Sequence, residues 1–345
     1  ITKLEGGIAS VACASGMAAL TNAFLNILQS GDEIVSSAGL YGGSIDLFRD
    51  LETFGITTKY VETNNWEQIE AAIGEHTKLI FAETIANPGL TVTNIEKMSE
   101  IAHNHGVPLI VDNTTATPYL IQALKHGADI VVNSSSKYMN GSSNAISGIL
   151  TDGGKFKWDK KKYPGMADYV KYGPMAFVAK LRNGIFRNTG ACLSPVNAYL
   201  NLIGIETLGL RMECECQNAL ELAHWIAENY SDIIVNYPGL ESSSWHHVAK
   251  EQFEHGYGAI LTLRVGSKEK AFKFIDSLTI PYIISNIGDT KTLVLHPAST
   301  ISLHSTDKEK EDAGVYEDLI RVSVGIEDIE DLKDDFAQAF LKIRD

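Results

Sequence analysis

Short, wholly apolar strand segments alternating with helical stretches are the feature that most constrains this fold. Residues 109–112 (Leu-Ile-Val-Asp) and 130–133 (Ile-Val-Val-Asn) are too apolar to face water on either side. Such strands belong to a mainly parallel sheet that is covered by helices on both faces. The same alternation continues over residues 10–150, so the sequence predicts an α/β fold for this part of the chain.

Individual elements can be assigned from periodicity and from the glycines that follow helices. We predict strands at 33–36, 57–61, 78–83, 109–112 and 130–133, preceded by apolar residues 8–12. The predicted helices are 17–28, 43–54, 66–73 and 94–105, three of them followed closely by Gly31, Gly55 and Gly106.

Beyond residue 148 the pattern loosens. Residues 151–173 are rich in Lys, Gly and Tyr and indicate a surface excursion. A long helix is predicted over 195–230, with a bend near Gly204 or Gly209. The remainder indicates a smaller α+β unit, so we expect two domains, residues 1–207 and 208–345, with the boundary inside the long helix. The elements of the second unit are expected at 257–265, 268–278, 291–296 and 319–324.

Charge and cysteine content exclude some classes of function. The net charge of -14 argues against nucleic acid as a partner. No apolar run is long enough to span a bilayer, and the opening Ile-Thr-Lys-Leu-Glu is not a secretory signal. The Cys214-Glu-Cys216 pair lacks a second pair of ligands, so we expect no metal site but free thiols in a reducing cytoplasm.

Polar side chains follow three of the predicted strands. Glu83 ends one, Asp112 ends the next, and Lys137 follows the third after three serines. Ligands of open α/β sheets bind at the carboxyl ends of strands. Lys137 is either a surface lysine in a loop or, if partly desolvated, a nucleophile that forms Schiff bases.

The neighbours of Lys137 favour the second alternative. Ser134 and Ser136 present hydroxyl groups that suit a phosphate. Ser15-Gly16-Met17 begins a helix, and free N–H groups at helix starts bind phosphate.

Three further residues have both a structural and a functional interpretation. Asp112 could cap a turn or could keep a pyridine nitrogen protonated. Tyr41 could stack on such a ring. Arg321, in an otherwise β-like segment, could complete a structural ion pair or bind the α-carboxylate of an amino acid through two hydrogen bonds.

Nine motifs, spread in order over almost the whole chain, resemble those of the Cys/Met-metabolism pyridoxal-phosphate enzymes. They are Leu-Glu-Gly-Gly at 4–7, Ser-Gly-Met at 15–17, Gly-Asp-Glu at 31–33, Ala-Asn-Pro at 86–88, Val-Asp-Asn-Thr at 111–114, Ser-x-Ser-Lys-Tyr at 134–138, Leu-Ser-Pro at 193–195, His-Pro-Ala-Ser at 296–299 and Arg-Val-Ser-Val-Gly-Ile-Glu at 321–327.

This resemblance implies an aspartate-aminotransferase-like fold (fold type I), with a large α/β domain built on a mainly parallel, seven-stranded-type sheet and a smaller C-terminal α+β domain. It also implies pyridoxal 5'-phosphate as the cofactor. Lys137 resembles the lysine that carries the cofactor, and Tyr41 the stacking tyrosine that also assists acid–base steps. Asp112 resembles the partner of the pyridine nitrogen, and Glu83 falls where the family has an acidic residue behind the site. The remaining implied roles are the phosphate cup (Ser15, Gly16, Met17, Ser134 and Ser136), the cofactor and substrate contact of Asn87, and the substrate contacts of Asn286 and Arg321.

The chain departs from the family pattern in three places. We expect the N-terminal arm, whose Tyr and Arg reach the neighbouring subunit's cofactor phosphate, to be absent from this chain. Asn133 stands where a histidine is usual, and residues 140–144 replace a Gly-His-Gly type of loop. The shared phosphate site implies a dimer, and the family usually pairs dimers into homotetramers.

Within the family, residues 178–182, 187–195 and 286–293 resemble the O-acetylhomoserine sulfhydrylase branch. The implied reaction is γ-replacement on O-acetyl-L-homoserine by sulfide or a small thiol, which gives homocysteine or methionine plus acetate. Methionine γ-lyase, cystathionine γ-synthase or γ-lyase, and a non-catalytic relative are the alternatives. Gly43, where methionine γ-lyases of this family typically carry a cysteine, either leaves room for the nucleophile or permits a tight turn.

Overall fold

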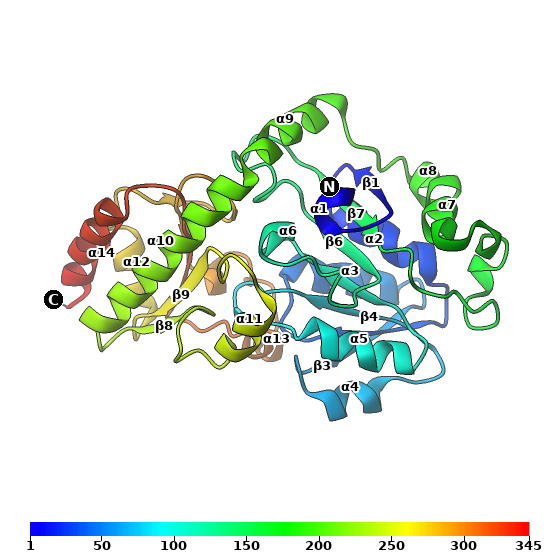
Figure 1. Cartoon of the computed structure of the whole chain (residues 1–345). Coiled ribbons are helices and arrows are strands. Elements are labelled where there is room, and N and C mark those ends of the chain that lie inside the picture. Colours follow the sequence, from blue (N-terminus) through cyan, green and yellow to red (C-terminus); the bar gives the residue numbers. More distant parts are fainter. Residues whose placement is uncertain (345) are drawn as a thin grey trace.

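The computed structural model describes residues 1–344, which form two sheets (Figure 1). The larger sheet has seven strands in the order β1-β7-β6-β5-β4-β2-β3. All neighbouring strands pair in parallel except where β7 lies antiparallel between β6 and β1. Their bounds are β1 Ala9–Cys13, β2 Glu33–Ser37, β3 Thr57–Val61, β4 Thr77–Glu83, β5 Leu109–Asp112, β6 Ile130–Asn133 and β7 Gly148–Asp152.

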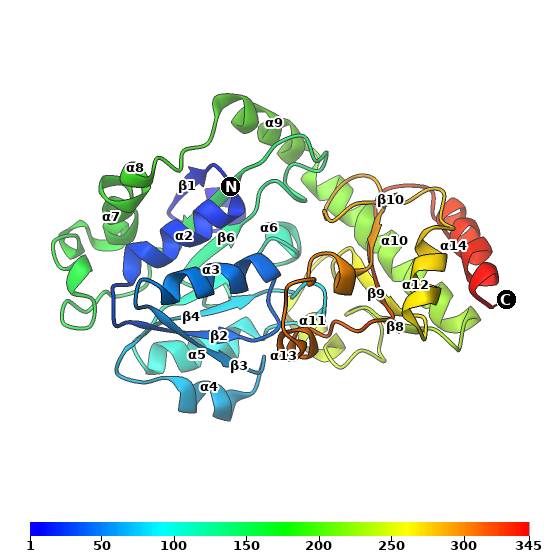
Figure 2. The same cartoon turned by 180° about the vertical axis from the view of Figure 1, so that it is seen from behind.

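Helices cover both faces of this sheet, as the sequence predicted. Helices α4 (Trp66–Ala72) and α5 (Ile95–Asn104) lie on the face seen in Figure 1. Helices α2 (Gly16–Ile27) and α3 (Gly42–Glu52) lie on the opposite face, seen in Figure 2. The α/β prediction is therefore confirmed, with helix ends displaced by one or two residues. The sequence analysis missed β7 and the short helices α1 (Thr2–Glu5) and α6 (Thr117–Leu120).

The segment 151–173 is mostly exposed or half-buried, as predicted for a surface excursion, but two of its residues anchor it in the core. Tyr163 and Met166 are buried, the latter in the short 3-10 helix η1 (Pro164–Met166). The Tyr163 hydroxyl donates to the backbone oxygens of Lys78 and Gly106 at 3.0 and 3.1 Å. A tyrosine whose hydroxyl group finds hydrogen-bond partners is readily buried, so Tyr163 is buried although lysines precede it in the sequence. A second 3-10 helix, η2 (Val170–Met175), leads into α7 (Ala176–Asn183) and α8 (Ile185–Thr189).

The long predicted helix is two helices, α9 (Pro195–Glu206) and α10 (Leu208–Asn229). The break lies at Thr207, between the two glycines at which a bend was expected. Arg211 holds this junction: its guanidinium donates to Gly204 O at 2.8 Å and to Tyr138 O at 2.7 Å. The first turn of α10 is thereby tied to the loop that follows β6.

The second sheet has five strands in the order β10-β11-β12-β9-β8. It lies entirely in residues after 207, and the division of the chain into domains at that point stays a prediction. The strands are β8 Ile234–Asn236, β9 Ile260–Arg264, β10 Tyr282–Ile283, β11 Leu293–Leu295 and β12 Leu319–Ser323; the remaining helices are α11 His246–Gln252, α12 Lys268–Ile275, η3 Pro297–Ser299, α13 Asp307–Asp312 and α14 Ile329–Arg344.

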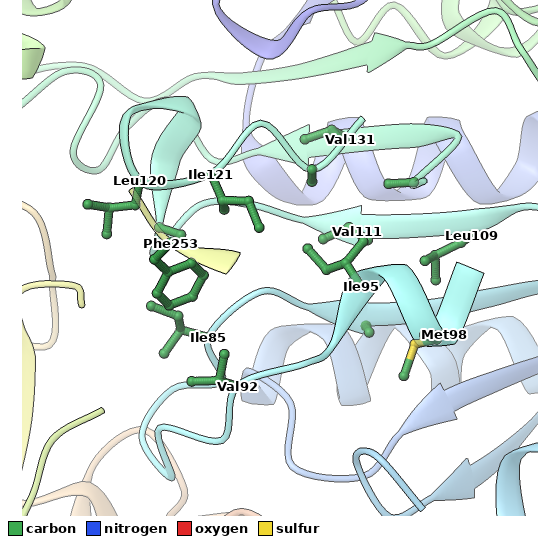
Figure 3. Close-up of a cluster of buried hydrophobic side chains, with 14 of the residues drawn as sticks. Ile85, Val92, Ile95, Met98, Leu109, Val111, Leu120, Ile121, Val131 and Phe253 are labelled. Atoms are coloured by element: carbon green, nitrogen blue, oxygen red, sulfur yellow. The ribbon is translucent and has the colours of Figure 1, made fainter. Parts of the chain in front are cut away.

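One buried cluster joins the two parts. Phe253, which follows α11, packs beside Ile85, Val92 and Leu120 of the larger part (Figure 3). Because apolar contacts continue across the junction, the smaller sheet is held at the carboxyl edge of the larger one.

Three observations concern metals, thiols and membranes. The four cysteines are free. No group of three or more His, Cys, Asp or Glu side chains that could hold a metal ion occurs in residues 1–344. No helix in the same range is both long enough and apolar enough to cross a membrane.

We expect Arg211→Leu to lower the free energy of unfolding by at least about 2 kcal/mol, because buried carbonyl oxygens would lose their donors. Chemical denaturation followed by circular dichroism measures this change. Arg344→Leu serves as the control, since its pair with Asp232 is exposed and contributes less than about 1 kcal/mol. An equal effect of the two substitutions would contradict the role given to Arg211.

Candidate functional site

A cavity of about 470 Å³ lies at the carboxyl ends of the central strands. Every site residue that the sequence predicted lines it: Ser15, Gly16, Met17, Tyr41, Glu83, Asn87, Asp112, Ser134, Ser136, Lys137, Asn286 and Arg321. The register of the sheet explains part of this convergence, because Glu83 pairs with Asp112 on neighbouring strands. The roles given to these residues stay predictions, but the structure places all of them around one space.

Lys137 is half-buried at the side of the cavity. Its Nζ donates to Oδ1 of Asn286. Burial, and to a lesser degree the charge of Arg321, lower the pKa of Lys137 to about 8. A lysine with so low a pKa has a substantial fraction of neutral amine near pH 7, which is the form that attacks a carbonyl carbon.

Arg321, on β12, is 1% exposed and reaches the cavity from the smaller sheet. Its guanidinium donates to Oδ1 of Asn87 at 3.2 Å and to the backbone oxygen of Asn286 at 2.7 Å. Its Nε has no hydrogen-bond partner, and no carboxylate of residues 1–344 forms an ion pair with it. The structural ion pair considered from the sequence is therefore wrong. A buried, unpaired guanidinium facing a cavity is suited to an anionic ligand.

The start of α2 forms one end of the cavity. Ser15 caps the helix by accepting from the N–H of Ala18 at 3.0 Å. A Cβ on Gly16 would lie 2.6 Å from Cβ of Ser134, so only glycine lets the helix approach this closely. The Ser136 hydroxyl already donates to Ser147 O, whereas the Ser134 hydroxyl makes no hydrogen bond within residues 1–344.

Two carboxyl groups lie at the floor of the cavity. Asp112 accepts from the N–H of Thr114 at 2.9 Å, as a turn residue would, and also faces the cavity. Asp112 therefore has the contact of a turn residue and a position at the cavity, and its role toward a ring nitrogen stays a prediction. Burial raises the pKa of Asp112, and burial with the nearby charge of Asp112 raises the pKa of Glu83 to about 8.

Tyr41 is the residue at the N-terminal cap of α3, and its ring lies over the start of that helix. A Cβ on Gly43 would lie 2.5 Å from the Tyr41 ring. Gly43 has no positive φ and lies inside α3, so the tight-turn explanation does not require glycine there. A larger residue at this position would instead require the Tyr41 ring to move.

Several lining residues escaped the sequence analysis. Thr114 accepts from the N–H of Ser134 at 2.7 Å and so fixes the loop after β6. Ser143 accepts from Nδ2 of Asn286 at 2.7 Å. The Val-Asp-Asn-Thr motif could have indicated Thr114, but no local pattern marks Ser143. The other lining residues are Leu20, Thr115, Ala145, Ile146, Ser285 and Ile287.

The cavity thus has three chemically distinct parts. Free N–H groups and a hydroxyl at the start of α2 suit a phosphate. Asp112 suits a protonated ring nitrogen, with the amine of Lys137 available for a carbonyl carbon. Arg321 suits a carboxylate on the opposite side. Together these groups fit a cofactor that carries a phosphate, a basic ring nitrogen and an aldehyde, with an amino acid beside it.

Known proteins resemble this chain over almost its whole length. The homocysteine synthase of Schizosaccharomyces pombe is 41% identical, over 98% of this chain and 82% of its own. The O-acetylhomoserine sulfhydrylase of Wolinella succinogenes has 41% identity and a TM-score of 0.87, covering 98% of this chain and 93% of that one.

A third relative carries the cofactor covalently. A structure of the O-acetylhomoserine (thiol)-lyase assigned in Campylobacter jejuni has a TM-score of 0.91 and 33% identity, covering 100% of this chain and 84% of its own. That structure contains a pyridoxyl-lysine monophosphate residue.

The family model described as "Cys/Met metabolism PLP-dependent enzyme" matches residues 1–341. The fold is that of the solved relatives, and the predicted site residues line one cavity. The chain belongs to the Cys/Met-metabolism family of pyridoxal-phosphate-dependent enzymes.

Proposed function

We propose that this enzyme is an O-acetylhomoserine sulfhydrylase, which replaces the acetate of O-acetyl-L-homoserine by sulfide or a small thiol. The products are homocysteine or methionine, plus acetate. One observation carries the proposal: the buried, unpaired Arg321 faces the same cavity as Lys137 and Asp112. The relatives named for this reaction, at about 40% identity over nearly the whole chain, support the choice of substrate.

The residues present fit pyridoxal 5'-phosphate. Gly16, Met17 and Ser134 would hold its phosphate, Asp112 its ring nitrogen, and Lys137 its aldehyde carbon. When bound, the cofactor supplies an electron sink that stabilises negative charge on the substrate's carbon atoms. Tyr41 would cover one face of the ring from the start of α3.

The protein's own groups hold the substrate and move its protons. Arg321 binds the α-carboxylate, with Asn87 fixing the guanidinium from one side. The amine of Lys137 would take the proton from the substrate's Cα. Asn286 accepts a hydrogen bond from that amine and so restricts where it can lie.

We expect sulfide replacement on O-acetylhomoserine to exceed elimination from methionine by at least about tenfold in kcat/KM, or roughly 1.4 kcal/mol in transition-state stabilisation. Homocysteine and 2-oxobutanoate are assayed together on one preparation. Faster formation of 2-oxobutanoate from methionine would assign the enzyme as a γ-lyase instead. The cofactor and lysine assignments do not depend on this result.

We expect Lys137→Ala to abolish turnover and the covalent attachment of the cofactor, because no other amine lines the cavity in residues 1–344. Borohydride reduction followed by peptide mass spectrometry should find the cofactor on the peptide that contains Lys137. Attachment to a different lysine would overturn the assignment.

The pH dependence of attachment provides an independent measurement. The neutral amine is the reactive form, and its fraction rises with pH through the pKa of about 8. The rate of covalent attachment to cofactor-free protein should therefore be half-maximal near pH 8. An ordinary lysine would give a midpoint near about 10.4.

We also propose a cytoplasmic enzyme that assembles into dimers and tetramers with shared sites. The free cysteines suit a reducing compartment.

Helix α9 supports assembly, because Val196, Tyr199 and Leu202 are each more than 60% exposed. The helix lies at the outer edge of the molecule (Figures 1 and 2) and contacts the cavity mouth, where Asn197 donates to Ile146 O at 2.9 Å. Exposed apolar faces of this extent are typical of subunit interfaces.

We expect Leu202→Glu to shift the protein toward monomers and to weaken cofactor binding, because a charge in an apolar interface is costly. Light scattering gives the mass and cofactor titration gives the affinity. Leu341→Glu, at an equally exposed position on α14, is the matched control and should change neither. A fully active monomer would refute shared sites.

A further inference from the structure

Glu83 is a buried carboxyl group at the end of β4 that no step of the proposed reaction uses. It is 6% exposed, and within residues 1–344 no cation pairs with it. Its Oε1 accepts from the backbone N–H of Tyr41 at 2.7 Å. The backbone N–H of Asn87 also lies near this carboxyl group and lowers its pKa. The side chain therefore contacts two separate loops at the cavity.

These two loops carry different parts of the site. The loop after β2 presents the Tyr41 ring, and the loop after β4 presents Asn87, whose Oδ1 accepts from Arg321. In the described part of the chain, no other hydrogen bond joins residues 38–44 to residues 83–92. Glu83 is thus the polar link between the cofactor-covering ring and the carboxylate-binding arginine.

The surroundings of Glu83 indicate that its carboxyl group acts as a hydrogen-bond acceptor and not through a negative charge. Its nearest ionisable neighbour is Asp112, which is also acidic, and burial with this neighbour raises the pKa of Glu83 to about 8. A protonated carboxyl group still accepts hydrogen bonds through its carbonyl oxygen. The length of the side chain and the position of that oxygen are what the two N–H groups require.

We infer that Glu83 is a positioning residue that fixes the separation between Tyr41 and the Asn87–Arg321 pair. This inference rests on the proposed function only for the roles given to Tyr41, as the ring that covers the cofactor, and to Arg321, as the group that binds the carboxylate. The geometric link between the loops can be measured without any turnover.

Two substitutions separate the effect of the length of the Glu83 side chain from the effect of its charge. Glu83→Gln keeps the length of the side chain and its accepting oxygen but removes the titrating group. Glu83→Asp keeps the carboxyl group but shortens the side chain by one methylene, so it cannot reach both loops. Asp152→Asn is the matched control, because Asp152 is a buried acid with a raised pKa that accepts from Gly154 N at 2.8 Å, at the far end of β7.

Backbone hydrogen exchange gives the direct measurement, made on protein with and without pyridoxal phosphate. Glu83→Asp should speed exchange at least about fivefold in both segments 38–45 and 84–92, since the shared hydrogen bonds hold both. Glu83→Gln should match the wild type in these segments, and Asp152→Asn should leave them unchanged. Fast exchange in Glu83→Gln, or unchanged exchange in Glu83→Asp, overturns the inference.

Steady-state kinetics on O-acetylhomoserine gives the second measurement. Glu83→Asp should raise KM and lower kcat, each by about tenfold, because it displaces both Arg321 and Tyr41. Glu83→Gln should retain most activity, with the pH profile of the wild type. If Glu83 instead acts through its charge or proton, Glu83→Asp is the active variant and Glu83→Gln the inactive one. Should the wild type lack sulfhydrylase activity, the proposed function fails while hydrogen exchange still decides the role of Glu83.

Discussion

The parallel pairing of β4, β5 and β6 is the constraint on which the rest of the site depends. Parallel strands bring their carboxyl ends to one edge, where the backbone leaves the sheet and side chains can converge. Glu83 and Asp112 end neighbouring strands in register, and Lys137 follows the third strand by one turn. Strand pairing thereby brings residues that are more than fifty positions apart in the sequence to one cavity.

Electrostatics of the cavity follow from burial. Desolvation disfavours every charge, so it lowers the pKa of Lys137 and raises the pKa values of Glu83 and Asp112. Burial also lowers the pKa of Arg321 to about 10, so its guanidinium group is still charged near pH 7, and no carboxylate of residues 1–344 forms an ion pair with it. The cavity therefore favours a ligand whose carboxylate binds Arg321 and whose amine lies near Lys137. An amino acid has both groups.

The smaller sheet completes the site from the other side. Arg321 reaches Asn87 of the larger part, and Asn286 lies between Arg321 and Lys137. A continuous apolar cluster that includes Phe253 holds the two parts together, and Arg211 ties the start of α10 to the loop that carries Lys137. Positions of reacting groups at this junction are therefore set by packing between the two sheets.

The sequence by itself determined the α/β class, the central strands and twelve of the residues that line the cavity, because apolar strand runs and motifs at strand ends are local signals. Sequence alone also left Asp112 and Arg321 with two interpretations each, and the tertiary structure excluded one of them, the structural ion pair of Arg321. It showed that Asp112 both caps a turn and faces the cavity, and that Arg321 lacks a partner charge. The burial of Tyr163 and Met166, the helix break at Thr207 and the contacts of Glu83 and Ser143 also required the tertiary structure. These features depend on contacts between residues far apart in the chain, which leave no periodic or local pattern to read.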